Sequence, residues 1–237
     1  MIQTASLCKS FGKCTALNGL SFSADNGSVT GLIGPNGCGK TTTLRLIAGL
    51  LRPGSGRVLV DGVDPANDPL AARRLMGALT DGLGNYPRLT TREHLWYFGQ
   101  LRGMSRVELE SRTRYLLDLF DMNEIADRRA VGFSQGERMK LALARAMIND
   151  PPNILLDEPA NGLDVHSTRA LRSLLERLRD TGKCIVLCSH LMTEISLVCD
   201  KVVVVTHGRV AAQGSPADLM LVGNARTLEE AFMGLTS

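Results

Sequence analysis

The stretch GPNGCGKTT, Gly34 to Thr42, decides how the rest of this sequence is interpreted. It fits the pattern G-x-x-x-x-G-K-[ST], and it lies between the strand-like run SVTGLI and an expected helix. Glycines in such a loop let backbone N–H groups turn inward around phosphate oxygens, and the start of the helix adds a partial positive charge. A glycine-rich turn with a chance lysine is the alternative, but it leaves these flanks unexplained. The sequence therefore predicts a loop that binds the phosphates of a nucleotide.

The residues of this loop have different expected tasks. The Lys40 ammonium would reach the β- and γ-phosphates, and the Thr41 hydroxyl would ligate Mg²⁺. Cys38 lies among the phosphate-binding amides, so a bulky group on its thiol is expected to block nucleotide binding. The whole expected phosphate-binding set is Gly34, Pro35, Asn36, Gly37, Cys38, Gly39, Lys40, Thr41 and Thr42.

A pair of acidic residues follows another strand-like run, ILLDEP. The strand is expected to end at Asp157, at the carboxyl edge of a sheet, where open α/β folds bind ligands. Asp157 would hold Mg²⁺ directly or through water, and Glu158 could take a proton from an attacking water as general base. Two acids after a strand are weak evidence alone. Together with the loop at residues 34–42 they indicate hydrolysis of a nucleoside triphosphate.

The stretch FSQGE, Phe133 to Glu137, distinguishes among the many proteins that carry such a loop. It resembles the signature motif of ATP-binding cassette (ABC) ATPases, commonly LSGGQ; Ser134 and Gly136 match, and the other three positions differ. Ser134 can cap the following helix, and its hydroxyl and the Gly136 N–H can face a γ-phosphate at the helix N-terminus. For this stretch alone, an ordinary serine cap is the alternative.

Three further motifs occur in the order typical of ABC ATPases. PANGLD resembles the D-loop, with Asp164 as its acid, and CSH places His190 as the switch histidine that contacts the γ-phosphate. KSFGK puts Phe11 where these ATPases stack an aromatic ring on adenine. The alternatives are a polar residue that closes a strand for His190 and a core aromatic for Phe11. Over nearly its whole length, the chain resembles the nucleotide-binding subunit of an ABC transporter.

Within that family the chain is most similar to the sodium-extrusion-type exporter ATPases, through LTDGLGNYPRLTTREHLWYFG and NGLDVHSTRALRSLLERLRDTGK. Most members have a glutamine where Asp81 aligns, and it links the metal site to the membrane subunit. An aspartate could approach Mg²⁺ through water, but an ionised carboxylate cannot donate a hydrogen bond. Trp96, Tyr97 and Phe98 are consecutive on an expected helix and cannot share one face. They are expected to divide between the core and a surface that docks a partner.

Alternating strands and helices predict an α/β fold with a mainly parallel sheet. The resemblance implies a P-loop NTPase RecA-like core with an N-terminal antiparallel β subdomain and an inserted helical subdomain, the ABC ATPase fold. We expect one domain, residues 1–237, with a nucleotide-binding core at 1–80 and 150–237 and a helical signature subdomain at 81–149. A helix is expected from Thr41 to Leu51.

Composition limits the other classes of protein. Of 237 residues, 44% are hydrophobic, and no apolar run approaches the roughly 18–20 residues of a membrane-spanning helix. The sequence shows no secretion signal, so we expect a peripheral place on the cytoplasmic face of the cell membrane. The 27 basic and 24 acidic residues are interspersed, which does not predict nucleic-acid binding. The six cysteines match no zinc pattern.

The resemblance implies an ATPase that uses ATP and Mg²⁺. Two cassettes, identical or different, would meet head to tail, each ATP lying between the phosphate loop of one and FSQGE of the other. Glu158, His190 and Lys40 are the expected catalytic residues. The region from Asp81 to about Met104 would pass the cycle to a separate transmembrane permease subunit.

Two alternatives belong to other classes. A soluble ABC ATPase acting on ribosomes or DNA usually carries two cassettes or a long coiled-coil insertion, and this sequence has neither. A regulatory protein with a degenerate site is disfavoured because Lys40, Asp157, Glu158 and His190 are all present.

Overall fold

The computed structural model of the chain describes residues 1–79 and 84–236 and divides into two compact units. The first comprises Met1–Thr80, Pro152–Pro159 and Leu175–Ser237, and the second comprises Asp81–Pro151 and Ala160–Leu174. The division expected from sequence had placed all of residues 150–237 in the core. The segment Ala160–Leu174 differs because it packs with the helical part of the chain.

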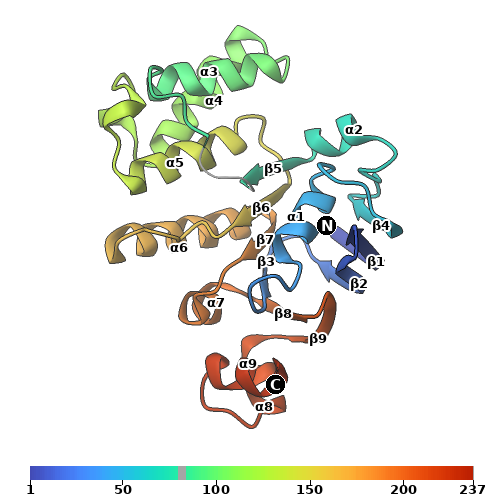
Figure 1. Ribbon diagram of the computed structural model, residues 1–237. Coiled ribbons are helices and arrows are strands. Elements are labelled where there is room, and N and C mark those ends of the chain that lie inside the picture. The colour runs from blue at the N-terminus through green and yellow to red at the C-terminus, as the bar shows by residue number, and fades with distance from the viewer. Residues whose placement is uncertain (80–83, 237) are drawn as a thin grey trace. The chain divides into compact units, whose positions relative to one another are not determined.

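The first unit is built on a largely parallel sheet whose described strands lie in the order β5-β6-β7-β3-β8-β9 (Figure 1). Neighbouring strands from β5 to β8 are parallel, and β9 pairs antiparallel with β8. All five residues of β7 are buried, as expected for a strand covered on both faces. The strands are β3 (Ser28–Ile33), β5 (Met76–Leu79), β6 (Asn153–Asp157), β7 (Cys184–Cys188), β8 (Lys201–Thr206) and β9 (Arg209–Gly214).

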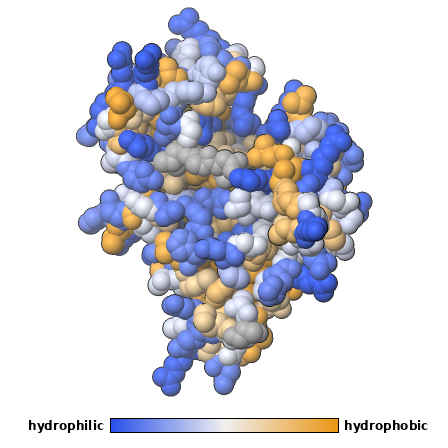
Figure 2. Space-filling view, viewed as in Figure 1, coloured by the Kyte–Doolittle hydropathy of each residue, from blue (hydrophilic) through white to orange (hydrophobic). Residues whose placement is uncertain are grey.

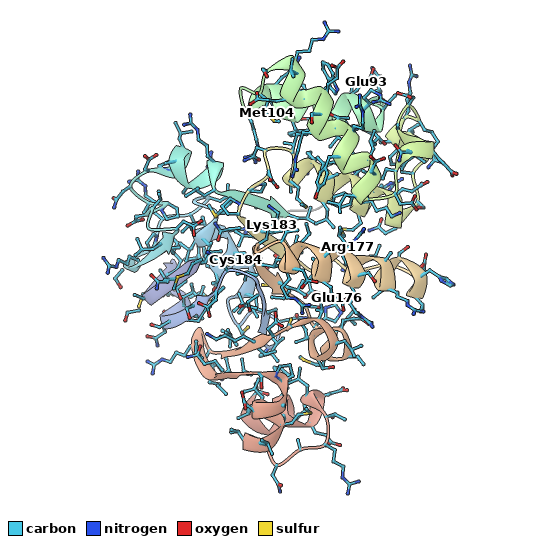
Figure 3. All side chains as sticks on the ribbon, turned by 180° about the vertical axis from the view of Figure 1, so that it is seen from behind. Glu93, Met104, Glu176, Arg177, Lys183 and Cys184 are labelled. Atoms are coloured by element: carbon cyan, nitrogen blue, oxygen red, sulfur yellow. The ribbon has the colours of Figure 1, made fainter. Side chains whose placement is uncertain are left out.

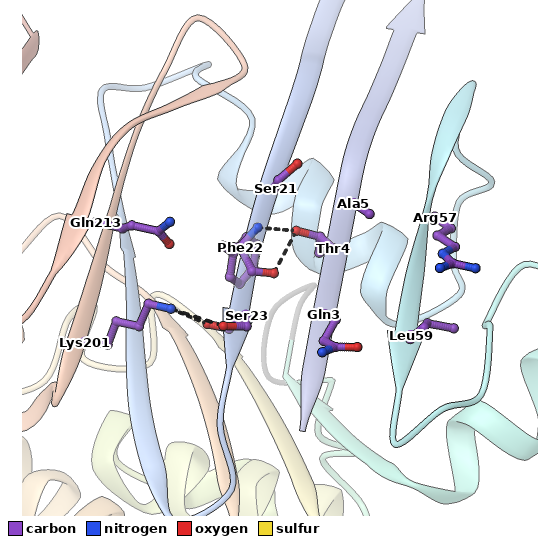
Figure 4. Close-up of a pocket in the computed structure, with 10 residues that line it drawn as sticks. All are labelled: Gln3, Thr4, Ala5, Ser21, Phe22, Ser23, Arg57, Leu59, Lys201 and Gln213. Atoms are coloured by element: carbon purple, nitrogen blue, oxygen red, sulfur yellow. Dashed lines mark hydrogen bonds between the residues drawn. The ribbon is translucent and has the colours of Figure 1, made fainter.

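An antiparallel sheet of order β2-β1-β4 also belongs to the first unit. Its strands are β1 (Ile2–Phe11), β2 (Cys14–Ala24) and β4 (Ser55–Val60). A hollow of about 480 Å³ is lined by residues of this sheet and by Lys201 and Gln213 of the other sheet. Among its lining residues, the Thr4 hydroxyl donates to the Phe22 carbonyl and accepts from the Phe22 N–H (Figure 4). None of the ten residues that line the hollow is one of the predicted site residues.

Helices α1 (Lys40–Ile47), α2 (Pro69–Arg74), α7 (Met192–Val198), α8 (Pro216–Val222) and α9 (Leu228–Thr236) complete the first unit. The expected helix from Thr41 to Leu51 is shorter in the structure. Ala48 caps it, and the N–H groups of Leu50 and Leu51 both turn back to the Arg45 carbonyl, which ends the regular ladder. Over α8 and α9 apolar residues reach the surface, among them Leu221, Val222 and Met233 (Figure 2).

The second unit is helical, and each of its main helices begins at a well-formed cap. Its elements are α3 (Thr91–Leu101), α4 (Arg106–Leu119), the short 3₁₀ helices η1 (Asn123–Ile125) and η2 (Ala130–Gly132), and α5 (Gln135–Ala146). Thr90, Ser105 and Ser134 each accept from the N–H of a glutamate three residues on, whose carboxylate accepts from the cap residue's own N–H. This reciprocal arrangement satisfies two backbone donors at each helix start.

Helix α6 (Val165–Asp180) begins in the second unit and ends in the first. Its apolar face follows the helical period, with Leu171, Leu174, Leu175 and Leu178 all buried. Glu176 and Arg177 project from the same helix in Figure 3, which also labels Cys184 at the start of β7. Within residues 1–79 and 84–236, none of the helices combines the length and hydrophobicity needed to cross a bilayer.

Candidate functional site

Three adjacent parallel strands bring the predicted nucleotide-binding residues of the first unit together. Strand β3 leads into the phosphate loop, β6 ends at Asp157 with Glu158 next, and β7 is followed by Ser189 and His190. The strands lie in the order β6-β7-β3, and Asp157 pairs with Cys188 at the end of β7. Since parallel strands present their carboxyl ends at one edge, these groups meet where α/β sheets bind ligands.

The phosphate loop approaches other backbone so closely that glycine is needed at two of its positions. A Cβ on Gly34 would lie 2.2 Å from the Val205 carbonyl oxygen, and one on Gly39 would lie 2.7 Å from that of Ala16. Gly39 also has a φ of 112°, which L-residues rarely adopt. Pro35, Asn36 and Gly37 are exposed at the tip of the loop. Its backbone amides are therefore available to an anion.

The Lys40 side chain folds back onto this loop. Its Nζ donates to the carbonyl oxygens of Gly34 at 2.7 Å and Pro35 at 3.3 Å, and the residue is 9% exposed. An ammonium carries three donors, so these two bonds leave one unused. Lys40 thus lies in the loop expected to hold the β- and γ-phosphates.

Thr41 and Asp157 meet directly at the start of α1. The Thr41 hydroxyl donates to Asp157 Oδ2 at 2.8 Å. Burial raises the pKa of Asp157 above its usual value, and the nearby Glu158 acts in the same direction, while the Thr41 hydrogen bond and the Lys40 charge lower it. The charged form of this half-buried carboxylate is therefore disfavoured overall.

This pair of oxygens fits a magnesium ion that takes its other ligands from elsewhere. Mg²⁺ prefers hard oxygen donors and is usually bound by one or two protein groups together with phosphates and water. Among the described residues, no group of three or more His, Cys, Asp or Glu side chains could hold a metal without such help. Thr41 and Asp157 would hold Mg²⁺ as part of a nucleotide complex.

Glu158 and His190 also form a pair. His190 Nδ1 lies 2.8 Å from Glu158 Oε2, and the Glu158 N–H donates to the Cys188 carbonyl at 2.9 Å. Glu158 has a φ of 50°, an uncommon conformation for a residue with a side chain, and such strain collects at functional sites. An ionised carboxylate only accepts, so Nδ1 carries the proton in this pair. The structure therefore brings the two predicted catalytic groups together.

Cys38 and Thr42 occupy the inner part of the loop region. Cys38 is 5% exposed, its N–H donates to the Pro35 carbonyl at 3.2 Å, and burial raises the pKa of its thiol despite the nearby Lys40 charge. Thr42 is half-buried in the first turn of α1. The thiol is thus present at the loop but mostly protonated at neutral pH.

Phe11 lies at the end of β1, in the antiparallel sheet. The residue is 49% exposed, and the Lys9 ammonium lies 5.4 Å from the centroid of its ring. The alternative of a core aromatic does not describe this position. The ring is accessible to a planar ligand, and its adenine-stacking role stays a prediction.

Ser134 and Gly136 belong to the second unit, at the beginning of α5. The Ser134 hydroxyl accepts from the Glu137 N–H at 3.2 Å, and Glu137 Oε2 accepts from the Ser134 N–H at 2.7 Å. Burial raises the pKa of Glu137, but these bonds and an ion pair with Arg128 lower it overall. The sequence pattern S-x-x-E is typical of such a capping box. From the sequence we had expected the serine cap but not the reciprocal bond from Glu137.

Asp164 serves its own chain as the cap of α6. Its carboxylate accepts from the Ser167 N–H at 2.7 Å and from the Ser167 hydroxyl at 3.3 Å. The hydrogen bond from the Ser167 N–H lowers the pKa of Asp164, so the carboxylate stays ionised. This cap places the helix start at Val165. A direct contact of Asp164 with nucleotide stays a prediction.

Asp81, the tentative metal-site residue, lies outside the described residues. Just after it, the Gly84 carbonyl accepts from Arg145 Nη1 at 2.5 Å, and the Arg145 guanidinium lies 4.7 Å from the centre of the Phe98 ring. His94 is fully buried and bonds to the Thr90 carbonyl and the Tyr86 N–H. Burial lowers the pKa of His94, which keeps the ring neutral. Sequence reasoning gave no role to Arg145 or His94.

Fold and site define an α/β ATP-binding protein with a phosphate loop and an acidic strand end. The sequence profile of the family described as ABC transporter matches residues 17–161. The chain belongs to the ATP-binding subunits of the ABC transporter family, and it is therefore an ATPase.

Two curated relatives show how far the similarity extends. The ABC transporter ATP-binding protein NatA of Bacillus subtilis (strain 168) is 40% identical over 219 residues, which cover 92% of this chain and 89% of that protein. The Nod factor export ATP-binding protein I of Rhizobium meliloti (strain 1021) is 39% identical over 215 residues, 91% of this chain and 64% of that protein.

Solved structures agree on the fold. An ATP-binding subunit of an ABC transporter covers the whole of both chains with a TM-score of 0.90 and 30% identity. A dimeric ATP-binding cassette in a post-hydrolysis state, bound to ADP and Pi, has a TM-score of 0.79 and 26% identity over 91% of this chain and 98% of that chain. The predicted ABC ATPase fold is thus confirmed.

Because the pKa of Asp157 is raised, replacing its carboxylate with a neutral group should stabilise the folded protein by an amount that depends on pH. Because the folded state raises this pKa, the charged carboxylate costs stability above the raised value and costs nothing well below its usual value. Asp157→Asn should raise Tm by on the order of 1–3 °C at pH 8, and the gain should shrink as the pH falls toward the pKa of Asp157. Calorimetry of the nucleotide-free protein measures it.

The exposed Asp25→Asn is the matched control, and it should leave Tm unchanged across the same pH range. ATP hydrolysis should be lost in Asp157→Asn and retained in Asp25→Asn. A lower Tm for Asp157→Asn at pH 8 would contradict the inferred cost of the half-buried Asp157 carboxylate.

Modification of Cys38 should abolish ATP binding slowly and in a pH-dependent manner. Since burial raises the pKa of this thiol, N-ethylmaleimide should react with it more slowly than with the exposed Cys14 and faster as the pH rises. ATP should protect Cys38 and not Cys14, as peptide mass spectrometry can show. If Cys38→Ala loses ATP binding at the same rate under the reagent, the assignment is wrong.

Proposed function

We propose that this ATPase is the motor subunit of an exporter, in which two cassettes close around ATP and drive a separate membrane subunit. The observation that carries the proposal is the meeting of Lys40, Thr41, Asp157, Glu158 and His190 at one sheet edge. A protein that bound ATP only as a regulator would not need a carboxylate held by a histidine beside the metal-binding pair.

Glu158 would act as the general base. Its carboxylate lies at the strand end next to Asp157 and is oriented by His190 and by the backbone bond to Cys188. It would accept a proton from the water that attacks the γ-phosphate. His190 Nδ1 would keep the carboxylate in place, and a doubly protonated ring could also donate through Nε2 to a phosphate oxygen.

Lys40 and the Thr41–Asp157 pair would stabilise negative charge on the phosphates. The Lys40 ammonium would exchange its bonds to the carbonyls of Gly34 and Pro35 for phosphate oxygens, which are stronger acceptors. Mg²⁺ held by Thr41 and Asp157 would neutralise charge that develops as the phosphate leaves. The backbone amides at residues 34–42 would bind the rest of the triphosphate.

A second cassette would complete each ATP site. The Ser134 hydroxyl accepts a bond from Glu137, yet a hydroxyl also carries a donor that can point to a phosphate oxygen. Ser134 and Gly136 would meet the ATP held by the partner's loop, so ATP would bind the closed dimer better than the open one. The dimeric cassette that shares this fold supports such an arrangement.

A membrane subunit would dock on the second unit. Tyr86, Tyr97 and Phe98 pack edge-to-face or stacked, with centroids 5.2 to 6.1 Å apart, and Tyr86 and Tyr97 are 47% and 42% exposed. We call these three residues the aromatic patch. Large, half-exposed aromatic side chains are enriched in protein interfaces. The patch falls within the region from Asp81 to about Met104 that we expect to couple hydrolysis to transport.

Export is the direction that the relatives favour, because both Nod factor export and linearmycin resistance appear in their names. The membrane subunit would select the cargo, and the chain would lie at the cytoplasmic face of the membrane. An ATPase acting on ribosomes or DNA is the competing proposal. The similarity to transporter ATP-binding proteins over 90% of the chain or more disfavours it.

Glu158→Gln should separate ATP binding from hydrolysis. Glutamine can still accept from His190 but cannot take a proton, so kcat should fall roughly 10²–10⁴-fold while ATP affinity stays within a few fold. The closed dimer should then accumulate with ATP, as light scattering after size exclusion can measure. Glu229→Gln, exposed on α9, is the control. Turnover like that of the unmodified protein would refute the base assignment.

The aromatic patch should be needed for capture of the membrane subunit. Tagged Glu158→Gln protein, pulled from detergent-solubilised membranes with ATP, should bring a polypeptide with several membrane spans. Adding Tyr97→Ala should abolish capture of that polypeptide. Adding Tyr115→Ala should not, although Tyr115 on α4 is similarly exposed. Ribosomal or DNA-associated proteins in place of a membrane protein would overturn the transporter proposal.

A further inference from the structure

The first turns of α5 and α6 approach each other closely in the second unit. A Cβ on Gly136 would lie 2.6 Å from Ser167 Oγ and 3.3 Å from Ser167 Cβ. Nearby, a Cβ on Gly162 would lie 3.8 Å from both Cγ and Nε2 of Gln135. The segment 162–164 and the start of α6 therefore pack against FSQGE of the same chain.

Ser167 cannot easily move away from this contact. Its N–H donates to Asp164 Oδ1 at 2.7 Å and its hydroxyl to Asp164 Oδ2 at 3.3 Å, while the Thr168 N–H bonds to the Asp164 carbonyl at 2.9 Å. A hydroxyl rotated away from Gly136 would lose its acceptor. The cap of α6 thus fixes the atom that faces Gly136.

Gly136 is fixed from the other side by the capping box of α5. The Ser134 and Glu137 backbones are each bonded to the other's side chain, and Glu137 pairs with Arg128. A side chain at position 136 would have to displace either this turn or the Ser167 hydroxyl. The contact with Ser167 therefore requires glycine at position 136, independently of any contact with a phosphate.

We propose that Ser167 is a positioning residue that joins the Asp164 segment to the signature turn at Ser134 and Gly136. It sets where these two residues lie when they meet the ATP held by a second copy. This rests on the proposed dimer. The segment follows Glu158 in the chain, so a displacement of residues 162–164 would be transmitted through Ser167 to the groups that serve the other ATP.

A different explanation makes an opposite prediction. If glycine at 136 served only close approach to the phosphate, a methyl group there would weaken the ATP-bound dimer whatever residue stood at 167. If the contact with Ser167 matters, removal of the Ser167 hydroxyl should relieve the methyl group, because the remaining Cβ contact of 3.3 Å requires only a small adjustment.

The test is a double-mutant cycle in the Glu158→Gln protein, read as ATP-dependent dimer affinity by analytical ultracentrifugation. Gly136→Ala should weaken the dimer roughly ten- to a hundredfold, as overpacking of a fixed contact does. Ser167→Ala alone should weaken it by about two- to fivefold through loss of the fixed hydroxyl. The combination of Gly136→Ala with Ser167→Ala should recover to near the level of Ser167→Ala.

Ser173→Ala, an exposed serine on the same helix, is the matched control and should not rescue Gly136→Ala. The melting temperature of the monomer should fall in Gly136→Ala and recover when Ser167→Ala is added, because the clash lies within one chain, whereas ATP affinity measured at the phosphate loop should be alike in all variants. If the double variant is as weak as Gly136→Ala, Ser167 has no positioning role. If Glu158→Gln itself fails to dimerise with ATP, the proposed dimer fails first, and the two failures are thereby distinguished.

Discussion

The parallel register of β6, β7 and β3 is the constraint on which the nucleotide site depends. Asp157 is opposite Cys188, and Gly31 and Leu32 of β3 are opposite Leu187 and Cys188 of β7. A slip of one residue would turn every side chain of a strand to the other face. It would move Asp157 away from Thr41. The buried aliphatic side chains of these strands hold the register, so the apolar core and the ATP chemistry have one geometric origin.

That geometry carries costs that the nucleotide would offset. The Asp157 carboxylate is held at a partly buried place that raises its pKa, and Glu158 adopts a positive φ. Lys40 is 9% exposed, and its ammonium donates to two backbone carbonyls. Each of these features is unfavourable by itself. Phosphate and Mg²⁺ would supply charges opposite to those of Lys40 and Asp157. Relief of these costs on binding would contribute to the affinity for ATP.

Sequence reasoning succeeded where a residue belongs to a recognisable local pattern, even when its partner is distant in the chain, and it failed where no such pattern exists. The loop at residues 34–42 and the pair Asp157–Glu158 carry their own local pattern and could be predicted. The four-residue strand β5, MGAL, is too short to show a period, and it was not expected. The contact of Ser167 with Gly136 joins residues of two separate helix starts, which no local pattern reports.

Glu137, the last residue of FSQGE, does not prevent a phosphate from binding near Ser134. A free carboxylate at Glu137 would repel a γ-phosphate approaching Ser134, and the lowered pKa means that it stays ionised. Its charge is not free, however, because Oε2 accepts from the Ser134 N–H and Oε1 pairs with Arg128, which also lies 4.9 Å from the centre of the Phe133 ring. The negative charge is tied to the helix start and opposed by a guanidinium. A glutamate at this position is thus compatible with an ATP-binding signature turn.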